Sequence, residues 1–256
     1  MRRFILKSAN VIISLFCACV LCIAGIYAIY ALWDNYQVYE AAKNVQDDML
    51  RLKPQGEDEG EFKQLLAVNS DVVAWITLDH TNIDYPVLQG DTNLTYINTD
   101  VYGNFALAGS IFLDSRCDRT FQSFYSLLYG HHMANDTMFA DLDLYKEQTF
   151  FKKNKTGKLK LPDGTYDLEI IACLVTAASD ENIFGMEKEQ SDMDSFLTYI
   201  EENALYQRKE MIENIRSQEN PKYQILAMST CSYEFTDART VVLAAMQKER
   251  DINPEG

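Results

Sequence analysis

The sequence predicts a mainly β fold with added helices, an α+β domain built as an antiparallel barrel or sandwich. From residue 72 onward, short runs rich in Ile, Val, Leu and aromatic residues are separated by Asp, Asn, Gly and Pro. Runs of this length are typical of strands, because helices need longer periodic segments. Met193 to Arg216 differs: apolar residues at helical spacing in a charged background predict one amphipathic helix, whole or interrupted. Many short strands with one inserted helix favour a barrel or a sandwich.

Eight strands are expected along the chain. In order they are Val72–Leu78, Ile83–Gln89, Ser110–Leu113, Ser126–Tyr129, Lys158–Leu161, Tyr166–Val175, Tyr223–Met228 and Thr240–Met246. Pro86 interrupts the second run, and proline has no amide hydrogen to donate to a ladder. We therefore expect an edge position or a bulge at Pro86.

The N-terminal segment has the length and composition of a membrane span. Val11 to Leu32 is a run of 22 residues without charge, preceded by Arg2, Arg3 and Lys7. A run of about 20 apolar residues crosses a bilayer as a helix. Basic residues on the N-terminal flank keep that end in the cytoplasm. The remainder of the chain is therefore expected outside the cell membrane, anchored by a single pass.

A cleaved signal peptide is the alternative to this anchor. Its apolar region is usually about 7–15 residues long and is followed by small residues at the cleavage site. Here the run is longer, and Tyr27, Tyr30 and Trp33 at its end resemble an interfacial aromatic belt. These features favour an uncleaved signal anchor.

The remainder of the chain divides into a spacer and a folded domain. We expect a cytoplasmic tip and transmembrane helix in residues 1–33, a helical juxtamembrane spacer in residues 34–61, and the folded extracellular domain in residues 62–256. Within the spacer, Pro54 to Gly60 contains helix breakers and an acidic cluster, which predict a loop or hinge.

The net charge of the chain argues against nucleic acid as a partner. The chain has a net charge of −15, and the part after residue 33 carries 20 basic against 38 acidic residues, a net charge of −18. A surface of this sign is unsuited to nucleic acid or to an anionic lipid face. The acidic EDEGE cluster lacks the spacing of a calcium loop, so neither a metal nor another cofactor is expected.

The six cysteines form two groups. Three lie in the apolar N-terminal run, and Cys117, Cys173 and Cys231 lie in the folded part. Because three is an odd number, at least one thiol has no intramolecular disulfide partner. A disulfide between Cys117 and Cys173 stays open at this point.

Cys231 and Arg239 form the first half of a candidate active site. Cys231 follows one predicted strand, and Arg239 enters the next strand eight residues later. Neighbouring strand ends joined by a short loop bring their side chains together across a groove. Arginine stays protonated at any working pH, so it can stabilise a thiolate or a developing oxyanion.

The second half is a base for the thiol. The chain has three histidines: His80 in a turn-like segment, where it is expected to be solvated, and the pair His131 and His132 after an apolar strand and Gly130. An imidazolium lowers the pKa of a nearby thiol and can later donate a proton to a leaving amine. Adjacent residues on a strand point to opposite faces, so only one of the pair is expected to reach Cys231.

Three motifs together resemble those of class B sortases, and the resemblance extends from about Phe62 to Gln247. They are Leu226-Ala227-Met228-Ser229-Thr230-Cys231 with Arg239, Tyr129-Gly130-His131-His132-Met133 with Met138-Phe139, and the block NSDVVAWITLDHTNIDYPVLQG at residues 69–90. The resemblance implies a sortase-like closed β-barrel with N-terminal helices and one long helix inserted before the cysteine strand.

The resemblance also implies roles for individual residues. Cys231 would be the nucleophile, His131 the acid/base, and Arg239 the oxyanion stabiliser or substrate clamp. Ser229, Asn93 and Ile97 would line the groove for the sorting peptide. Two acidic neighbours, Glu234 and Asp237, either orient Arg239 or are solvated loop residues.

The implied enzyme is a cysteine transpeptidase of Gram-positive bacteria. It would cleave surface proteins after the Thr of an LPXTG-like or NPQTN-like sorting signal and join them to an amine of a peptidoglycan precursor or cross-bridge. Two alternatives stay open: a pilin-polymerising sortase, although no acidic-aromatic lid motif precedes the barrel, and a non-catalytic membrane-anchored binding module in which Cys231 is structural.

Overall fold

The structure, a computed structural model, describes residues 2–55, 59–186, 192–217, 223–231, 234 and 236–249. Two compact units are present, residues 1–41 and residues 42–256. Helix α1, Arg2–Leu50, includes the expected span and continues into the expected spacer. Its part from Asn10 contains an 18-residue window with a mean hydropathy of 2.6, long and apolar enough to cross a membrane, a test that a signal sequence also passes.

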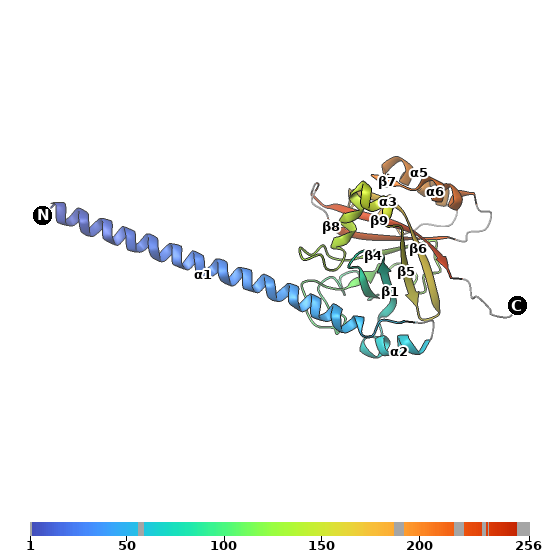
Figure 1. The fold of residues 1–256 in the computed structure, drawn as a ribbon, viewed down its shortest axis with the longest axis horizontal. Coiled ribbons are helices and arrows are strands. Elements are labelled where there is room, and N and C mark those ends of the chain that lie inside the picture. The colour runs from blue at the N-terminus through green and yellow to red at the C-terminus, as the bar shows by residue number, and fades with distance from the viewer. Residues whose placement is uncertain are drawn as a thin grey trace. The chain divides into compact units, whose positions relative to one another are not determined.

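Nine strands are present among the described residues. They are β1 Val72–Leu78, β2 Asp84–Leu88, β3 Ile111–Leu113, β4 Tyr125–Tyr129, β5 Thr156–Leu161, β6 Gly164–Ala177, β7 Tyr206–Gln207, β8 Gln224–Cys231 and β9 Ala238–Lys248. Eight of them pair in the order β5-β1-β2-β3-β4-β8-β9-β6, and β6 pairs with β5 to close the circle. The chain therefore has the closed barrel that the sequence motifs implied (Figure 1).

Six further helices are described; α2 precedes β1, and the others lie in connections between strands. They are α2 Glu59–Val68, the 3₁₀ helix η1 Ala140–Lys146, α3 Gln148–Lys153, α4 Glu181–Phe184, α5 Met193–Asn203 and α6 Lys209–Arg216. The expected loop at Pro54 to Gly60 lies partly outside the described residues, because residues 56–58 are not described.

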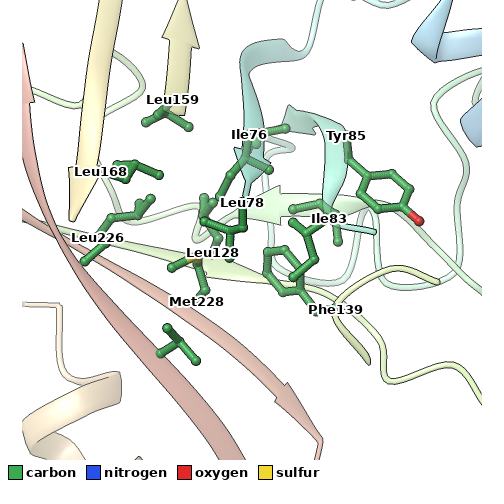
Figure 2. Close-up of a cluster of buried hydrophobic side chains, with 14 of the residues drawn as sticks. Ile76, Leu78, Ile83, Tyr85, Leu128, Phe139, Leu159, Leu168, Leu226 and Met228 are labelled. Atoms are coloured by element: carbon green, nitrogen blue, oxygen red, sulfur yellow. The ribbon is translucent and has the colours of Figure 1, made fainter. Parts of the chain in front are cut away.

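Alternation along the strands separates a barrel interior from an outer layer. On β8, Leu226 and Met228 pack in the interior cluster, which Figure 2 shows with side chains from β1, β4, β5 and β6. Their neighbours Ile225 and Ala227 belong to a second cluster, which includes buried side chains of α5 and α6. This period-two pattern decides which residues at the end of β8 face outward.

The expected long helix is two helices. The backbone N–H of Leu205 donates to Cys173 O at 2.9 Å, and that of Arg208 donates to Ile171 O at 2.8 Å. The residues between form β7, which pairs with the edge of β6. Carbonyl groups on that edge of β6 need hydrogen-bond donors, and the chain supplies them by adopting an extended conformation. The helix is therefore interrupted between α5 and α6.

Pro86 lies inside the barrel wall, in a stretch of β2 with one ladder. It is paired with Trp75 of β1, whereas the parallel ladder to β3 begins at Val87. The missing amide hydrogen of Pro86 therefore costs no bond to β3. The expectation of an edge strand or a bulge at Pro86 is wrong: β2 pairs with a strand on each side, and the nearby register shift lies in β1, between Val72 and Ala74.

Candidate active site

The last residue of β8 and the second residue of β9 form a cross-strand pair. Cys231 is the register partner of Arg239 in the antiparallel ladder. Residues directly opposite in such a ladder have Cβ atoms about 4.5–5.5 Å apart on the same face. The thiol is exposed, and the guanidinium is half-buried, with its Nη1 donating to Ala238 O at 2.9 Å. A permanent cation therefore lies beside an accessible thiol.

The two histidines lie in different surroundings. In the parallel ladder, Tyr129 of β4 pairs with Ser229 of β8. His131 and Cys231 follow this pair by two residues on their respective chains, so both face outward with Tyr129 and Ser229. His132 instead contacts Asp143, with 3.2 Å between Nε2 and Oδ2. The alternation expected from the sequence thus separates the two imidazoles.

A backbone carbonyl orients the His131 ring. His131 Nε2 lies 2.7 Å from Ile97 O. A carbonyl oxygen can only accept, so Nε2 carries the hydrogen and Nδ1 is the nitrogen that gains or loses a proton. Fixing one ring nitrogen in this way selects both the tautomer and the direction in which the acid/base nitrogen points.

All six residues expected at the site line one groove of about 280 Å³. Its lining residues are Asn93, Leu94, Ile97, Phe112, Tyr129, Gly130, His131, Ser229, Thr230, Cys231 and Arg239. The groove is concave and contains both apolar walls and a few polar groups, which is typical of a binding site for a small ligand or peptide.

Gly130 is required by close packing at the groove floor. A Cβ atom at this position would lie 2.4 Å from Ile111 Cδ1 and 2.8 Å from two ring atoms of Phe139. Both neighbours are buried, so they have little room to move. Glycine lets the chain turn from β4 into the histidine pair while its N–H donates to Ser229 O at 3.2 Å.

Comparison with known proteins identifies the family. Sortase B of Staphylococcus aureus is 34% identical over 202 residues, which cover 78% of this chain and 80% of the relative. The chain belongs to the class B sortase family. It is therefore a cysteine transpeptidase of the sortase type, which removes support from the non-catalytic alternative. No family model matches the chain.

Solved class B sortases have the same fold. A Clostridium perfringens sortase B with Ser in place of a Cys has a TM-score of 0.70 at 30% identity, over 78% of this chain and 96% of that one. A Streptococcus pyogenes class B sortase involved in pilus biogenesis has a TM-score of 0.63 at 36% identity, over 73% and 97%. The sortase-like barrel expected from the motifs is confirmed.

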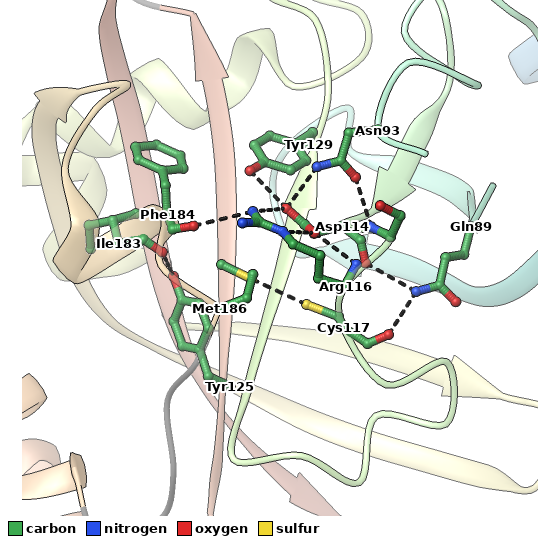
Figure 3. A network of polar contacts seen from close by, with 11 residues as sticks. Gln89, Asn93, Asp114, Arg116, Cys117, Tyr125, Tyr129, Ile183, Phe184 and Met186 are labelled. Carbon is green, nitrogen blue, oxygen red and sulfur yellow. Dashed lines mark hydrogen bonds and ion pairs between the residues drawn. The ribbon is translucent and has the colours of Figure 1, made fainter. Parts of the chain in front are cut away.

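One buried carboxylate of this sortase holds two groove residues, and sequence reasoning missed it. The side chain of Asp114, just after β3, has no solvent exposure. Its Oδ2 accepts from Asn93 Nδ2 at 2.9 Å and from Tyr129 OH at 3.1 Å, as Figure 3 shows. Because Asn93 and Tyr129 both line the groove, Asp114 fixes the orientation of the groove wall from behind.

Arg116 supplies the opposite charge. Its Nε and Nη2 donate to the two oxygens of Asp114 at 2.9 and 2.7 Å. Burial raises the pKa of the Asp114 carboxyl, but the bonds from Arg116 and Asn93 outweigh it and lower this pKa. The carboxyl is therefore charged at neutral pH. An Asp directly after an apolar strand and two residues before an Arg was the available signal in the sequence.

The remaining expected residues are placed as follows. Ser229 is buried, and its Oγ has no hydrogen-bond partner among the described residues. Glu234 pairs with Lys146 at 2.6 Å, and Asp237 O accepts from Ala178 N at 2.9 Å. Cys117 and Cys173 form no disulfide.

No group of three or more His, Cys, Asp or Glu among the described residues could hold a metal ion.

Proposed function

We propose that this class B sortase cleaves surface proteins after the Thr of an LPXTG-like or NPQTN-like sorting signal and transfers them to an amine of the cell wall. The observation that carries the proposal is the pairing of exposed Cys231 with Arg239 in a groove that also contains His131. Together these side chains supply a nucleophile, an oxyanion stabiliser and an acid/base.

The first half-reaction forms a thioester. The Cys231 thiolate attacks the Thr carbonyl carbon, and the Arg239 guanidinium stabilises the developing oxyanion or clamps the substrate beside it. The C–N bond then breaks, and the imidazolium of His131 gives its proton to the departing amine. The acyl group stays on sulfur, and the C-terminal part of the sorting signal leaves.

The second half-reaction resolves the thioester. An amine of a peptidoglycan precursor or cross-bridge attacks the same carbonyl carbon and loses a proton to the neutral His131. A new amide bond forms, and the Cys231 thiolate is the leaving group. If water attacks instead, the product is a free acid, so hydrolysis is the competing outcome.

Three further groove residues are proposed to bind the sorting peptide. Ser229 lines the groove, and its buried hydroxyl, which has no partner among the described residues, would bond a peptide carbonyl or amide that reaches it. The carboxamide of Asn93 is oriented by Asp114, which prepares it for a polar substrate side chain. Ile97 is 37% exposed and offers apolar contact, while its carbonyl orients His131.

The membrane is the proposed location of the reaction. Residues 1–33 would be the cytoplasmic tip and transmembrane anchor, residues 34–61 the spacer and residues 62–256 the extracellular catalytic domain. The apolar part of α1 and the basic residues before it support this arrangement. Confining enzyme and membrane-bound substrates to one surface raises their effective concentration.

A panel of internally quenched peptides tests the chemistry. The panel contains LPXTG-like, NPQTN-like and scrambled motifs, each with and without an amine acceptor. We expect cleavage after Thr, a Cys231-linked acyl adduct by mass spectrometry, and loss of both in Cys231→Ala. If the folded wild-type protein cleaves no peptide and forms no adduct, the proposed reaction is wrong.

A pilin-polymerising role is the second candidate. It is favoured by the 36% identity to the Streptococcus pyogenes class B sortase involved in pilus biogenesis. In that case the resolving amine would be a Lys side chain of another pilin subunit. Incubation with candidate pilins decides between the two: a ladder of high-mass covalent products supports pilin assembly, whereas transfer only to a cell-wall amine supports anchoring.

A further inference from the structure

Asp143 of η1 contacts the immediate neighbours of two proposed catalytic residues. Its Oδ1 accepts from Thr240 Oγ1 at 2.6 Å, and Thr240 directly follows Arg239. Its Oδ2 lies 3.2 Å from His132 Nε2, and His132 directly follows His131. These contacts lie on the inner side of the chain, opposite the groove.

Lys146 extends this cluster toward the nucleophile. Its Nζ lies 3.0 Å from Asp143 Oδ2 and 2.6 Å from Glu234 Oε1. Glu234 comes three residues after Cys231 and five before Arg239. Lys146 is 22% and Asp143 24% exposed, so the cluster is partly shielded from water. Burial lowers the pKa of Lys146, but its bonds to Glu234 and Asp143 outweigh this and raise the pKa.

These contacts have a direct consequence for catalytic geometry. Adjacent residues on an extended chain share a backbone and point to opposite faces. Holding Thr240 on the inner face therefore sets the direction of Arg239 on the outer face. The Glu234–Lys146 ion pair ties a residue of the β8–β9 connection to η1. None of the three charged residues lines the groove itself.

We propose that Asp143, Lys146 and Glu234 are positioning residues, a network on η1 and the β8–β9 connection that sets Arg239 against Cys231. The inference rests on the proposed function, in which Arg239 stabilises the oxyanion on the Cys231-bound carbonyl. A displacement of about 1 Å in such a site can lower the rate up to about 100-fold. Removing one ion pair from this partly shielded network is expected to displace Arg239 by less than this and to lower kcat about tenfold.

The experiment uses the full-length chain in detergent with four test variants. They are Lys146→Met, Glu234→Gln, the double variant, and Lys146→Arg, which keeps the charge and the donors. Lys158→Met is the matched control, because Lys158 also contacts one Asp and one Glu, Asp167 and Glu249, at the β5–β6 side of the barrel. kcat and KM are measured with the preferred peptide.

We expect Lys146→Met and Glu234→Gln each to lower kcat about tenfold with KM within about twofold. The double variant is expected to be no slower than the slower single variant, because residues of one network are not additive. Lys146→Arg is expected to keep most of the wild-type kcat. An unchanged kcat in Lys146→Met, or an equal loss in Lys158→Met at a similar melting temperature, would overturn the proposal.

A second measurement separates positioning from long-range charge. The pH midpoint for alkylation of Cys231 is followed by mass spectrometry of its peptide. Through-space charge alone would move the two variants oppositely: removing the cation of Lys146 raises the midpoint, and removing the anion of Glu234 lowers it. Displacement of Arg239 raises the midpoint in both variants, because the thiolate loses the cation that is its register partner across the ladder.

The two readouts also separate this proposal from the proposed function. If the wild-type chain cleaves no peptide, the proposed reaction fails, while the alkylation midpoints still decide the network. Midpoints that shift upward in both variants support the positioning role. Midpoints that shift in opposite directions, or not at all, overturn it.

Discussion

Asp114→Asn tests whether one buried carboxylate holds the groove wall of this sortase. The substitution keeps the shape of the side chain but removes its charge and replaces one accepting oxygen with an amide that donates. Asn93 and Tyr129 both donate to the same oxygen of Asp114. If the amide occupies that position, it faces these two donors and also Arg116 Nη2, which donates to the same oxygen, so the groove side chains must rotate away.

The magnitude follows from the contacts. A hydrogen bond to a charged group contributes about 1.5–3 kcal/mol, and about one such bond is lost on the groove side. The Arg116 side chain is 54% exposed, so solvent screens its ion pair to about 0–1 kcal/mol. The free energy of unfolding should therefore fall by about 3 kcal/mol. For a domain of about 200 residues this lowers Tm by about 6–12 °C.

The pH dependence of the stability difference between wild type and Asp114→Asn is an independent test of the same idea. In the folded chain the pKa of Asp114 lies below its ordinary value, because the bonds from Arg116 and Asn93 outweigh burial. A carboxyl with a lowered folded pKa contributes stability above its unfolded pKa of about 4 and loses it as the pH falls through the folded value. The Tm difference between wild type and Asp114→Asn should narrow below about pH 4 and stay constant from about pH 6 to pH 8.

The assay is thermal denaturation followed by near-ultraviolet circular dichroism, with KM for the preferred peptide measured on the same samples. Asp91→Asn is the control, because Asp91 is an exposed aspartate in the β2–β3 connection, two residues before the groove residue Asn93. We expect Asp114→Asn to raise KM and lower Tm, and Asp91→Asn to change neither. A Tm within about 2 °C of wild type, or a difference that does not depend on pH, would refute the reasoning.

Four further predictions concern the groove and the core. His131→Ala should lower kcat by about 100-fold or more, the usual contribution of an acid/base, whereas His132→Ala should lower it by at most about tenfold in the same peptide assay. Gly130→Ala, which places a Cβ 2.4 Å from a buried side chain, should destabilise the fold by about 1–3 kcal/mol in a melting experiment. Burial raises the pKa of Cys173 to about 12, so mass spectrometry should find this thiol unmodified until the protein unfolds. EDTA should leave peptide cleavage unchanged; a substantial loss would reveal a metal requirement.

Local patterns predicted the strands because their causes are local. Each of the eight expected apolar runs forms a strand of the barrel, since alternation and β-branched residues act within a few neighbouring residues. The pairing of Cys231 with Arg239 follows from the same logic, because a short connection between antiparallel strands leaves few registers. The separation of His131 from His132 needed only the period of an extended chain.

Non-local contacts could not be predicted in this way. The division of the expected helix into α5 and α6 depends on carbonyl groups at the edge of β6, more than 30 residues earlier in the sequence. The Asp114 network joins Asn93 and Tyr129, which lie 21 and 15 residues from it and on different sides of β3. Neither partner is marked by any pattern near Asp114.

The sequence by itself determined the apolar N-terminal run, the strand order along the chain and the identity of the thiol, imidazole and guanidinium. These depend on residue type and on spacing within one or two elements. Only the tertiary structure decided how the barrel closes through β5 and β6, and which side chains form the groove wall and its support. The physical reason is that ladders and buried polar networks join residues far apart in the chain, and their partners are selected by geometry that exists only after folding.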